Sequence, residues 1–242
     1  MIRGVTERIG AVGERRASHP WLCAIGLGAL VFLSIPIVLS LYYTVLPPPA
    51  SSLMIGRALS GYGIDYRWMP LKSISPELAK AVVAAEDARF CEHHGIDWQA
   101  VQLVVEEALE DDEQPVRGAS TIAMQTAKNL FLWNGRSVLR KIIEVPLAMW
   151  IDAIWTKKRL IELYLNIAEW APGVYGAEAA AHKHFGKPAS RLTKREAALL
   201  AAVLPNPIRQ QAGKPSDAVR RKAGLIERRI AGMGPLLHCL WP

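Results

Sequence analysis

The chain has 242 residues, of which 51% are hydrophobic and 21% are charged, and its formal net charge is +7 at pH 7. This length suits one sizeable globular domain with appended segments, and the positive charge favours anionic partners such as phosphate groups or anionic lipid. Nucleic acid is disfavoured as a partner, because the sequence contains no zinc-finger spacing and no ribonucleoprotein motif.

The first predicted element is an apolar segment from Leu22 to Leu46 that contains no charged residue. As a helix it could cross a hydrocarbon core of roughly 30 Å, so we predict a transmembrane helix over residues 21–46. A cleaved signal peptide is the alternative, but its apolar region would be shorter and would end at small residues. Arginines are concentrated before the segment, which predicts that residues 1–20 are a cytoplasmic tail and that the rest lies outside that membrane.

Residues 47–69 are predicted to form a linker, because three successive prolines favour an extended chain and the segment up to Pro70 is rich in glycine. From there to Pro242 the signals are helical almost throughout, and no long run alternates with period two. We therefore predict one domain over 70–242 with an all-α (mainly α) fold. The predicted helix starts are Ser75, Asp97, Ser137, Ser216 and a capping box made by Thr193 and Glu196.

Residues 84–98 raise the first question about chemistry, because they place Glu86 and Asp87 side by side ahead of His93. In a helix predicted over 76–89, Glu86 lies near the C-terminal end, where the helix dipole disfavours an anion. An acid/base centre, a metal site and the charged edge of an ordinary helix are the three interpretations. No second cluster has metal-ligand spacing, which weakens the metal interpretation.

The next two stretches carry polar side chains at helical spacing. A row of hydrogen-bond donors shares one helix face: Ser120, Thr121, Gln125 and Lys128. Donors of this kind suit phosphate or sugar oxygens, although an ordinary surface helix has the same pattern. Arg140 and Glu144 then lie four residues apart, as in an intrahelical ion pair, and Pro146 is expected to bend or interrupt the helix that carries them.

The cysteines show no metal-binding spacing. Cys23 lies in the predicted transmembrane helix, which leaves Cys91 and Cys239. The sequence leaves open whether these two form a disulfide.

In chain order, five stretches between Val82 and Pro207 resemble the successive motifs of the peptidoglycan glycosyltransferase family. They read EDARFCEHHG, GASTIAMQTAKNLFL, RKIIE, KKRLIELYLNIAEWAPGVYGAEAAA and LTKREAALLAAVLPNP. The chain is most similar to the monofunctional members, which have one N-terminal anchor and no penicillin-binding domain. In agreement, it contains neither Ser-x-x-Lys nor Lys-Thr-Gly.

The resemblance implies a lysozyme-like, two-lobed α-helical domain that polymerises lipid II into β-1,4-linked glycan strands. The donor anomeric carbon would be inverted and polyprenyl pyrophosphate released. It also implies a single-pass protein of the inner (plasma) membrane with a cytoplasmic N-terminus and a periplasmic catalytic domain. The implied partners are lipid II, the growing glycan chain, the membrane, and proteins of cell-wall synthesis and division. No cofactor is required, and a divalent cation (Mg or Mn) at the pyrophosphate is left open.

By motif position, Glu86 matches the general base of the family and Glu144 its second catalytic glutamate. Lys128, Arg140 and Lys141 match the cations around the donor pyrophosphate. The other positions matched to the substrate cleft are Asp87, Phe90, His93, Ser120, Thr121, Gln125, Asn129, Lys157, Glu162 and Asn166. The departures from the family pattern are Met124, where a glutamine is usual, Cys91 and Pro146.

Two other functions compete with this interpretation. A lytic transglycosylase or lysozyme-like enzyme would cleave the same glycan, but it needs a protonated glutamate and no pyrophosphate site, so the three cations favour synthesis. The second competing function is that of a catalytically silent membrane-anchored scaffold, and the presence of both Glu86 and Glu144 disfavours it.

Overall fold

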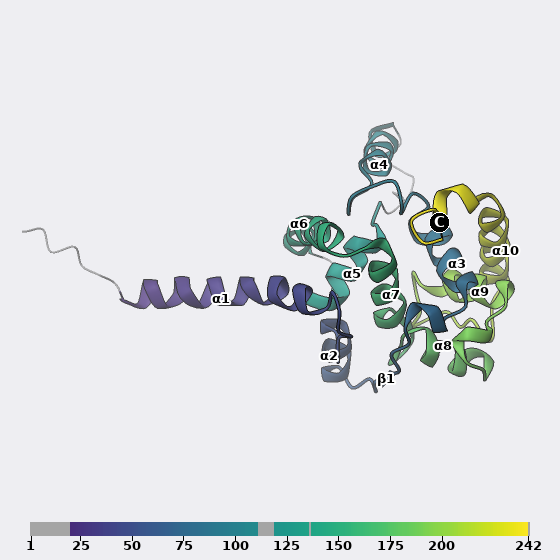
Figure 1. The fold of residues 1–242 in the computed structure, drawn as a ribbon, viewed down its shortest axis with the longest axis horizontal. Coiled ribbons are helices and arrows are strands. Elements are labelled where there is room, and N and C mark those ends of the chain that lie inside the picture. Colours follow the sequence, from purple (N-terminus) through teal and green to yellow (C-terminus); the bar gives the residue numbers. More distant parts are fainter. Residues whose placement is uncertain (1–19, 111–118, 136, 242) are drawn as a thin grey trace, which may run out of the picture. The chain divides into compact units, whose positions relative to one another are not determined.

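The computed structural model describes residues 20–110, 119–135 and 137–241 (Figure 1). In these residues the fold is mainly helical, which confirms the predicted class. The helices are α1 (Pro20–Tyr42), α2 (Ser52–Leu59), α3 (Pro76–Glu86), α4 (Trp98–Glu110), α5 (Ile122–Phe131), α6 (Val138–Ile154), α7 (Lys157–Ile167), α8 (Ala177–Phe185), α9 (Lys194–Val203) and α10 (Asp217–Gly232). The strands are β1 (Asp65–Tyr66), β2 (Glu169–Ala171) and β3 (Val174–Tyr175).

The chain divides into two compact units, with the boundary after Leu39. The first unit contains most of α1, which ends at Tyr42, before the predicted limit at Leu46. Among the residues described, no helix has both the length and the apolar character needed to cross a membrane. The transmembrane helix predicted over 21–46 is therefore not confirmed, and the predicted cytoplasmic tail lies, except for Pro20, outside the described residues.

The second unit begins at Ser40, well before the domain start predicted near Pro70. Residues 40–69 pack against the helical core, because Tyr43 and Met54 are buried and Met54 is completely inaccessible. Hydrogen bonds add to this packing: the Ser52 hydroxyl donates to the carbonyl of Leu132, and Trp155 Nε1 donates to the carbonyl of Ser40 at 2.9 Å. The segment predicted to be a linker is thus part of the folded unit.

Two groups of helices make up most of the second unit. In one group α3, α9 and α10 pack together, and in the other α5 packs against α6 and α7 (Figure 1). The first group meets along small and aliphatic side chains, such as Ala79, Val82 and Leu200, that have no exposed surface. Close packing of this kind fixes the end of α3, where Glu86 lies, relative to the neighbouring helices.

A short three-stranded sheet in the order β1-β3-β2 completes the second unit. β1 pairs with β3 in parallel and β2 pairs with β3 antiparallel. Arg57 of α2 forms an ion pair with the buried Glu169 of β2, at 3.0 Å from Nε to Oε2. The sheet therefore ties α2 to the end of α7.

Most predicted helix starts are confirmed by their capping hydrogen bonds. Thr193 and Glu196 form the reciprocal capping box, Ser137 and Ser216 accept backbone N–H groups, and Asp97 accepts the N–H of Ala100 at 3.0 Å. Ser75 differs, because its hydroxyl donates to the carbonyl of Leu192 at 2.9 Å and does not cap α3.

One prediction about helix continuity is wrong, and a second is wrong in part. α3 ends at Glu86 and does not continue to Arg89, so Phe90 and His93 lie in the following loop. Conversely, α6 continues through Pro146, so the helix is not interrupted there, and a bend at this residue stays a prediction. Pro146 and Ile142, whose carbonyl loses its usual partner at this proline, both lie on an exposed part of α6.

Cys91 and Cys239 form a disulfide that joins the loop after α3 to the C-terminal segment, with 5.6 Å between their Cα atoms. The bond closes a loop with a sequence separation of 148 residues. A long loop is costly to close in the unfolded chain, so loop-closure entropy predicts stabilisation of up to about 5 kcal/mol.

We expect the double variant Cys91→Ser/Cys239→Ser to have a lower free energy of unfolding, by about 2–5 kcal/mol. Thermal unfolding followed by circular dichroism, with and without dithiothreitol, measures this effect. Reductant should lower the melting temperature of the native chain and leave that of the double variant unchanged. An equal effect of reductant on both proteins would contradict the prediction.

Candidate active site

Glu86 is the last residue of α3 and is half-buried. Its Oε2 accepts a hydrogen bond from Nε2 of Gln125, on α5, at 2.9 Å. A cavity of about 200 Å³ lies beside Glu86, and Ser120 and Thr121 are among the other residues that line it. A carboxylate held by a neutral donor at the wall of a cavity can take a proton from a hydroxyl group that binds there.

Asp87 follows Glu86 directly but is fully engaged in structural contacts. Its Oδ1 lies 2.8 Å from Nε2 of His93, and its Oδ2 accepts the backbone N–H of Ile122, in the first turn of α5, at 2.9 Å. Both side chains are buried. Because both oxygens of Asp87 already have partners, of the two adjacent carboxylates Glu86 is the one suited to be a base.

The loop after Asp87 is held in place by contacts from several helices. Lys157 Nζ donates to the carbonyl of His93 and to Oδ1 of Asp152, each at 2.7 Å, and lies 4.8 Å from the centre of the Phe90 ring. Gly95 has a φ of +81°, and a Cβ there would lie 2.8 Å from the carbonyl oxygen of Ala148. Lys157 and Phe90 therefore shape this loop.

A second charged cluster is built on α6 around Glu144, which is only 2% exposed. Arg140 donates to Oε2 of Glu144 at 2.7 Å, and Lys141 Nζ lies 3.2 Å from Oε1 and also donates to the Ser120 hydroxyl at 2.8 Å. Every oxygen of this carboxylate thus has a cationic partner. The ion pair predicted from the spacing of Arg140 and Glu144 is confirmed.

Lys128 of α5 interacts electrostatically with two carboxylates, those of Glu144 and Glu86. Burial lowers the pKa of its ammonium group, while Glu144 and, more weakly, Glu86 act in the opposite direction. Arg140 and Lys141 add to the lowering, so three cations and two carboxylates act on one another in this region. Its net positive charge, together with the hydroxyl of Ser120, suits a ligand with two negative charges.

The predicted row of donors on α5 reaches the site only in part. Ser120, Gln125 and Lys128 contact or face the charged groups described above. The Thr121 hydroxyl caps α5 and donates to the carbonyl of Gly95 at 2.6 Å. Asn129 is buried, and its backbone carbonyl accepts a hydrogen bond from Ser52 at 3.0 Å.

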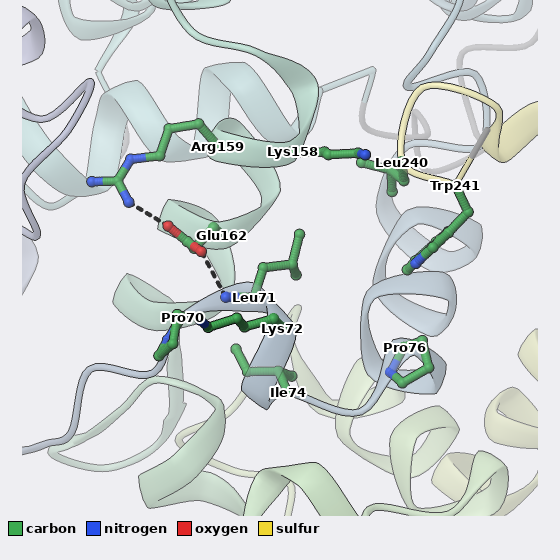
Figure 2. Close-up of a pocket in the computed structure, with 10 residues that line it drawn as sticks. All are labelled: Pro70, Leu71, Lys72, Ile74, Pro76, Lys158, Arg159, Glu162, Leu240 and Trp241. Carbon is green, nitrogen blue, oxygen red and sulfur yellow. Dashed lines mark hydrogen bonds and ion pairs between the residues drawn. The ribbon is translucent and has the colours of Figure 1, made fainter.

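Glu162 and Asn166 of α7 lie apart from these groups. Figure 2 shows Glu162 between Arg159 and the backbone N–H of Leu71, at the wall of a separate cavity of about 620 Å³. Asn166 has no exposed surface, and its amide exchanges two hydrogen bonds of 2.8 Å with the backbone of Met69. Both residues hold the segment that leads into α3, and direct contact with substrate stays a prediction for them.

Sequence analysis did not single out Tyr164, which reaches the site from α7. Its hydroxyl donates to Oε1 of Gln125 at 2.9 Å, and the ring is 1% exposed. In the sequence Tyr164 is one of several large side chains on the buried face of α7, so nothing distinguishes it from ordinary core. Its role depends on which helix packs beside it.

Residues for a protein-bound metal ion are not assembled in the described part of the chain, where no group of three His, Cys, Asp or Glu side chains converges. Both oxygens of Glu144 are already engaged by Arg140 and Lys141. The donor set here therefore fits an anion better than a resident divalent cation.

Comparison with known proteins gives consistent results. The family model described as "Transglycosylase" matches residues 55–231. A protein of Rhizobium etli named "Biosynthetic peptidoglycan transglycosylase" is 50% identical over 226 residues, which cover 93% of this chain and 96% of the relative. Relatives with the same name from Agrobacterium fabrum and Rhodospirillum centenum are 55% and 54% identical, and cover 79% and 81% of this chain and 84% of their own length each.

Proposed function

This chain belongs to the transglycosylase family and is a peptidoglycan glycosyltransferase, and we propose that Glu86 and the cation cluster divide its reaction between them. The cation cluster consists of Lys128, Arg140 and Lys141. The substrate in this proposal is lipid II, and the product is a β-1,4-linked glycan strand. The observation that carries the proposal is the pairing of one available carboxylate, Glu86, with a separate cationic site nearby.

The first half of the proposed reaction takes place at Glu86. The carboxylate accepts the proton of the 4-hydroxyl group of the acceptor sugar while that oxygen attacks the anomeric carbon of the donor. A new carbon–oxygen bond forms on the face opposite the leaving group, so the α linkage to pyrophosphate becomes a β-1,4 linkage. No covalent bond between sugar and protein is needed.

The second half takes place at the cation cluster. As the bond between the anomeric carbon and the pyrophosphate oxygen breaks, its electron pair stays on that oxygen, and negative charge grows there. Lys128 and Arg140 stabilise this charge more strongly in the transition state than in the bound substrate. Glu144 keeps Arg140 and Lys141 in position through its two ion pairs. No step is assigned to a metal ion.

We also propose that the two helix groups are the lobes of a lysozyme-like domain. Glu86 ends α3, in one group, whereas the cation cluster belongs to α5 and α6, in the other. The hydrogen bond between Gln125 and Glu86 joins the two groups. A donor and an acceptor bound between them would meet at Glu86.

Incubation of the purified protein with lipid II, followed by separation of the glycan products, tests the proposed function. Long glycan strands are the expected product. Short anhydro or reducing fragments from added glycan would instead indicate a lytic enzyme, and no change in either substrate would indicate a scaffold.

The proposed enzyme works at a membrane surface, because its substrate carries a polyprenyl tail. An apolar row on α6 supports this: Val138, Leu139 and Ile142 are 79%, 61% and 63% exposed. Exposed apolar side chains next to basic residues are typical of surfaces that rest on lipid. We propose that this row contacts the bilayer and that the apolar N-terminal segment anchors the chain in the inner membrane.

The proposed topology places the N-terminus in the cytoplasm and the catalytic domain in the periplasm. The disulfide between Cys91 and Cys239 supports it, because such bonds persist in oxidising compartments and are rare in the cytosol. The arginines in the first 20 residues support the same orientation.

We expect the variant Val138→Ser/Leu139→Ser/Ile142→Ser of a chain that begins at Ser40 to bind lipid vesicles about tenfold more weakly, or worse. Co-sedimentation with phosphatidylethanolamine–phosphatidylglycerol vesicles measures the binding. The control is Leu225→Ser, which changes an apolar residue of α10 that is 48% exposed. Equal losses for both variants would contradict the assignment of the α6 row to the membrane.

A further inference from the structure

A chain of two hydrogen bonds connects the core of the second unit to the carboxylate of Glu86. The Tyr164 hydroxyl lies 2.9 Å from Oε1 of Gln125, and Gln125 Nε2 lies 2.9 Å from Oε2 of Glu86. The three residues come from α7, α5 and α3, which lie far apart in the sequence. The chain therefore crosses between the two helix groups at the proposed base.

The direction of donation in this chain follows from chemistry. Burial raises the pKa of Tyr164 well above its ordinary value, and the nearby carboxylates of Glu86 and Asp87 raise it further. The phenol therefore stays protonated and donates to the carbonyl oxygen of Gln125. The amide N–H₂ group of Gln125 must then face Glu86, where it donates to Oε2.

The two oxygens of Glu86 consequently differ. Oε2 is held by Gln125, whereas Oε1 makes no hydrogen bond within the described residues. Other charged groups also face this carboxylate: Asp87 is adjacent, and Lys128 of α5 and Lys222 of α10 act on it electrostatically. Lys222 is itself tied to the carbonyl of Ala202 at 3.3 Å.

We propose that Tyr164 is a positioning residue for the base: through Gln125 it fixes Oε2 of Glu86 and leaves Oε1 to accept the proton of the acceptor hydroxyl. This inference rests on the proposed function of Glu86. Removal of the phenol hydroxyl leaves the carbonyl of Gln125 without its partner, so the amide can rotate away from the carboxylate. Glu86 then loses both its fixed orientation and its hydrogen-bond donor.

The test is Tyr164→Phe in the full chain, with the steady-state kinetics of lipid II polymerisation measured. We expect kcat to fall roughly two- to tenfold, with little change in KM. Gln125→Met, which removes the donor and keeps the shape, should have the same effects more strongly. Combining the two changes should cost no more than Gln125→Met alone, because both break one chain.

Tyr175→Phe is the matched control, because Tyr175 is also fully buried and its phenol lies beside Glu169, outside the chain that leads to Glu86. Its kcat and KM should equal those of the wild type. An unchanged kcat in Tyr164→Phe, or additive losses in the double variant, would overturn the inference. Glu86→Gln distinguishes failure of the positioning role from failure of the proposed function. If Glu86→Gln is inactive while Tyr164→Phe behaves as the wild type, the proposed function stands and the positioning role fails.

Discussion

Replacement of Glu86 by Gln is expected to lower the rate of lipid II polymerisation by about 10²–10⁴ while binding of lipid II changes little. The amide keeps the size of the side chain but cannot accept the proton of the acceptor hydroxyl at neutral pH. Asp87 cannot take over, because its two oxygens are engaged by His93 and by the backbone of Ile122. The loss should therefore appear in kcat.

Two further variants sharpen this prediction. Glu86→Asp keeps the charge but withdraws the carboxylate by one methylene group from Gln125 and from the acceptor, so it should also be slow. Glu106→Gln is the matched control, because it makes the same chemical change at an exposed residue of α4. A wild-type rate for purified Glu86→Gln would show that another group removes the proton.

Replacement of Lys128 by Ala is expected to lower kcat by about 10²–10³, the usual effect of removing one group that stabilises charge in a transition state. The domain should remain folded, because the ammonium group makes no hydrogen bond or ion pair within the residues described. Lys158→Ala, which removes an exposed lysine of the same charge from α7, is the control. Equal rates for both variants would mean that Lys128 contributes only general surface charge.

The pH dependence provides a second test of Lys128. Burial lowers the pKa of this lysine, so its charge is lost as pH rises through the lowered value, before an ordinary lysine would lose it. Activity should fall correspondingly on the alkaline side. In Lys128→Arg the guanidinium stays charged, so that alkaline fall should move to higher pH. An identical alkaline limb in both proteins would contradict this assignment.

Local features of the fold could be predicted well from the sequence. Capping signals depend only on residues a few positions apart, so the starts at Thr193, Ser137 and Ser216 are confirmed. The predictions fail where contacts between residues far apart in the sequence determine the local structure. Ser75 donates to Leu192, and residues 40–69 are ordered by packing against α5 and α6, which no local pattern shows.

Motif positions could predict which residues gather in the fold, whereas the roles of these residues in the reaction stay predictions. Glu86, Gln125, Lys128, Arg140, Lys141 and Glu144 lie around the two charged centres. Glu162 and Asn166 belong to the same matched stretches yet hold the backbone near Leu71 and Met69. A motif records that a residue type is needed at a position, and only the fold shows whether it faces substrate or backbone. For the same reason Tyr164 was missed.

The central claim is that one base and one cationic leaving-group site make each glycosidic bond by direct inversion. The most direct measurement is the anomeric configuration of every new linkage, together with the amount of polyprenyl pyrophosphate released per linkage, in products made from lipid II by the purified protein. The account predicts β-1,4 linkages throughout and one polyprenyl pyrophosphate for each of them. Linkages with the α configuration of the donor, or cleaved fragments without released pyrophosphate, would contradict it.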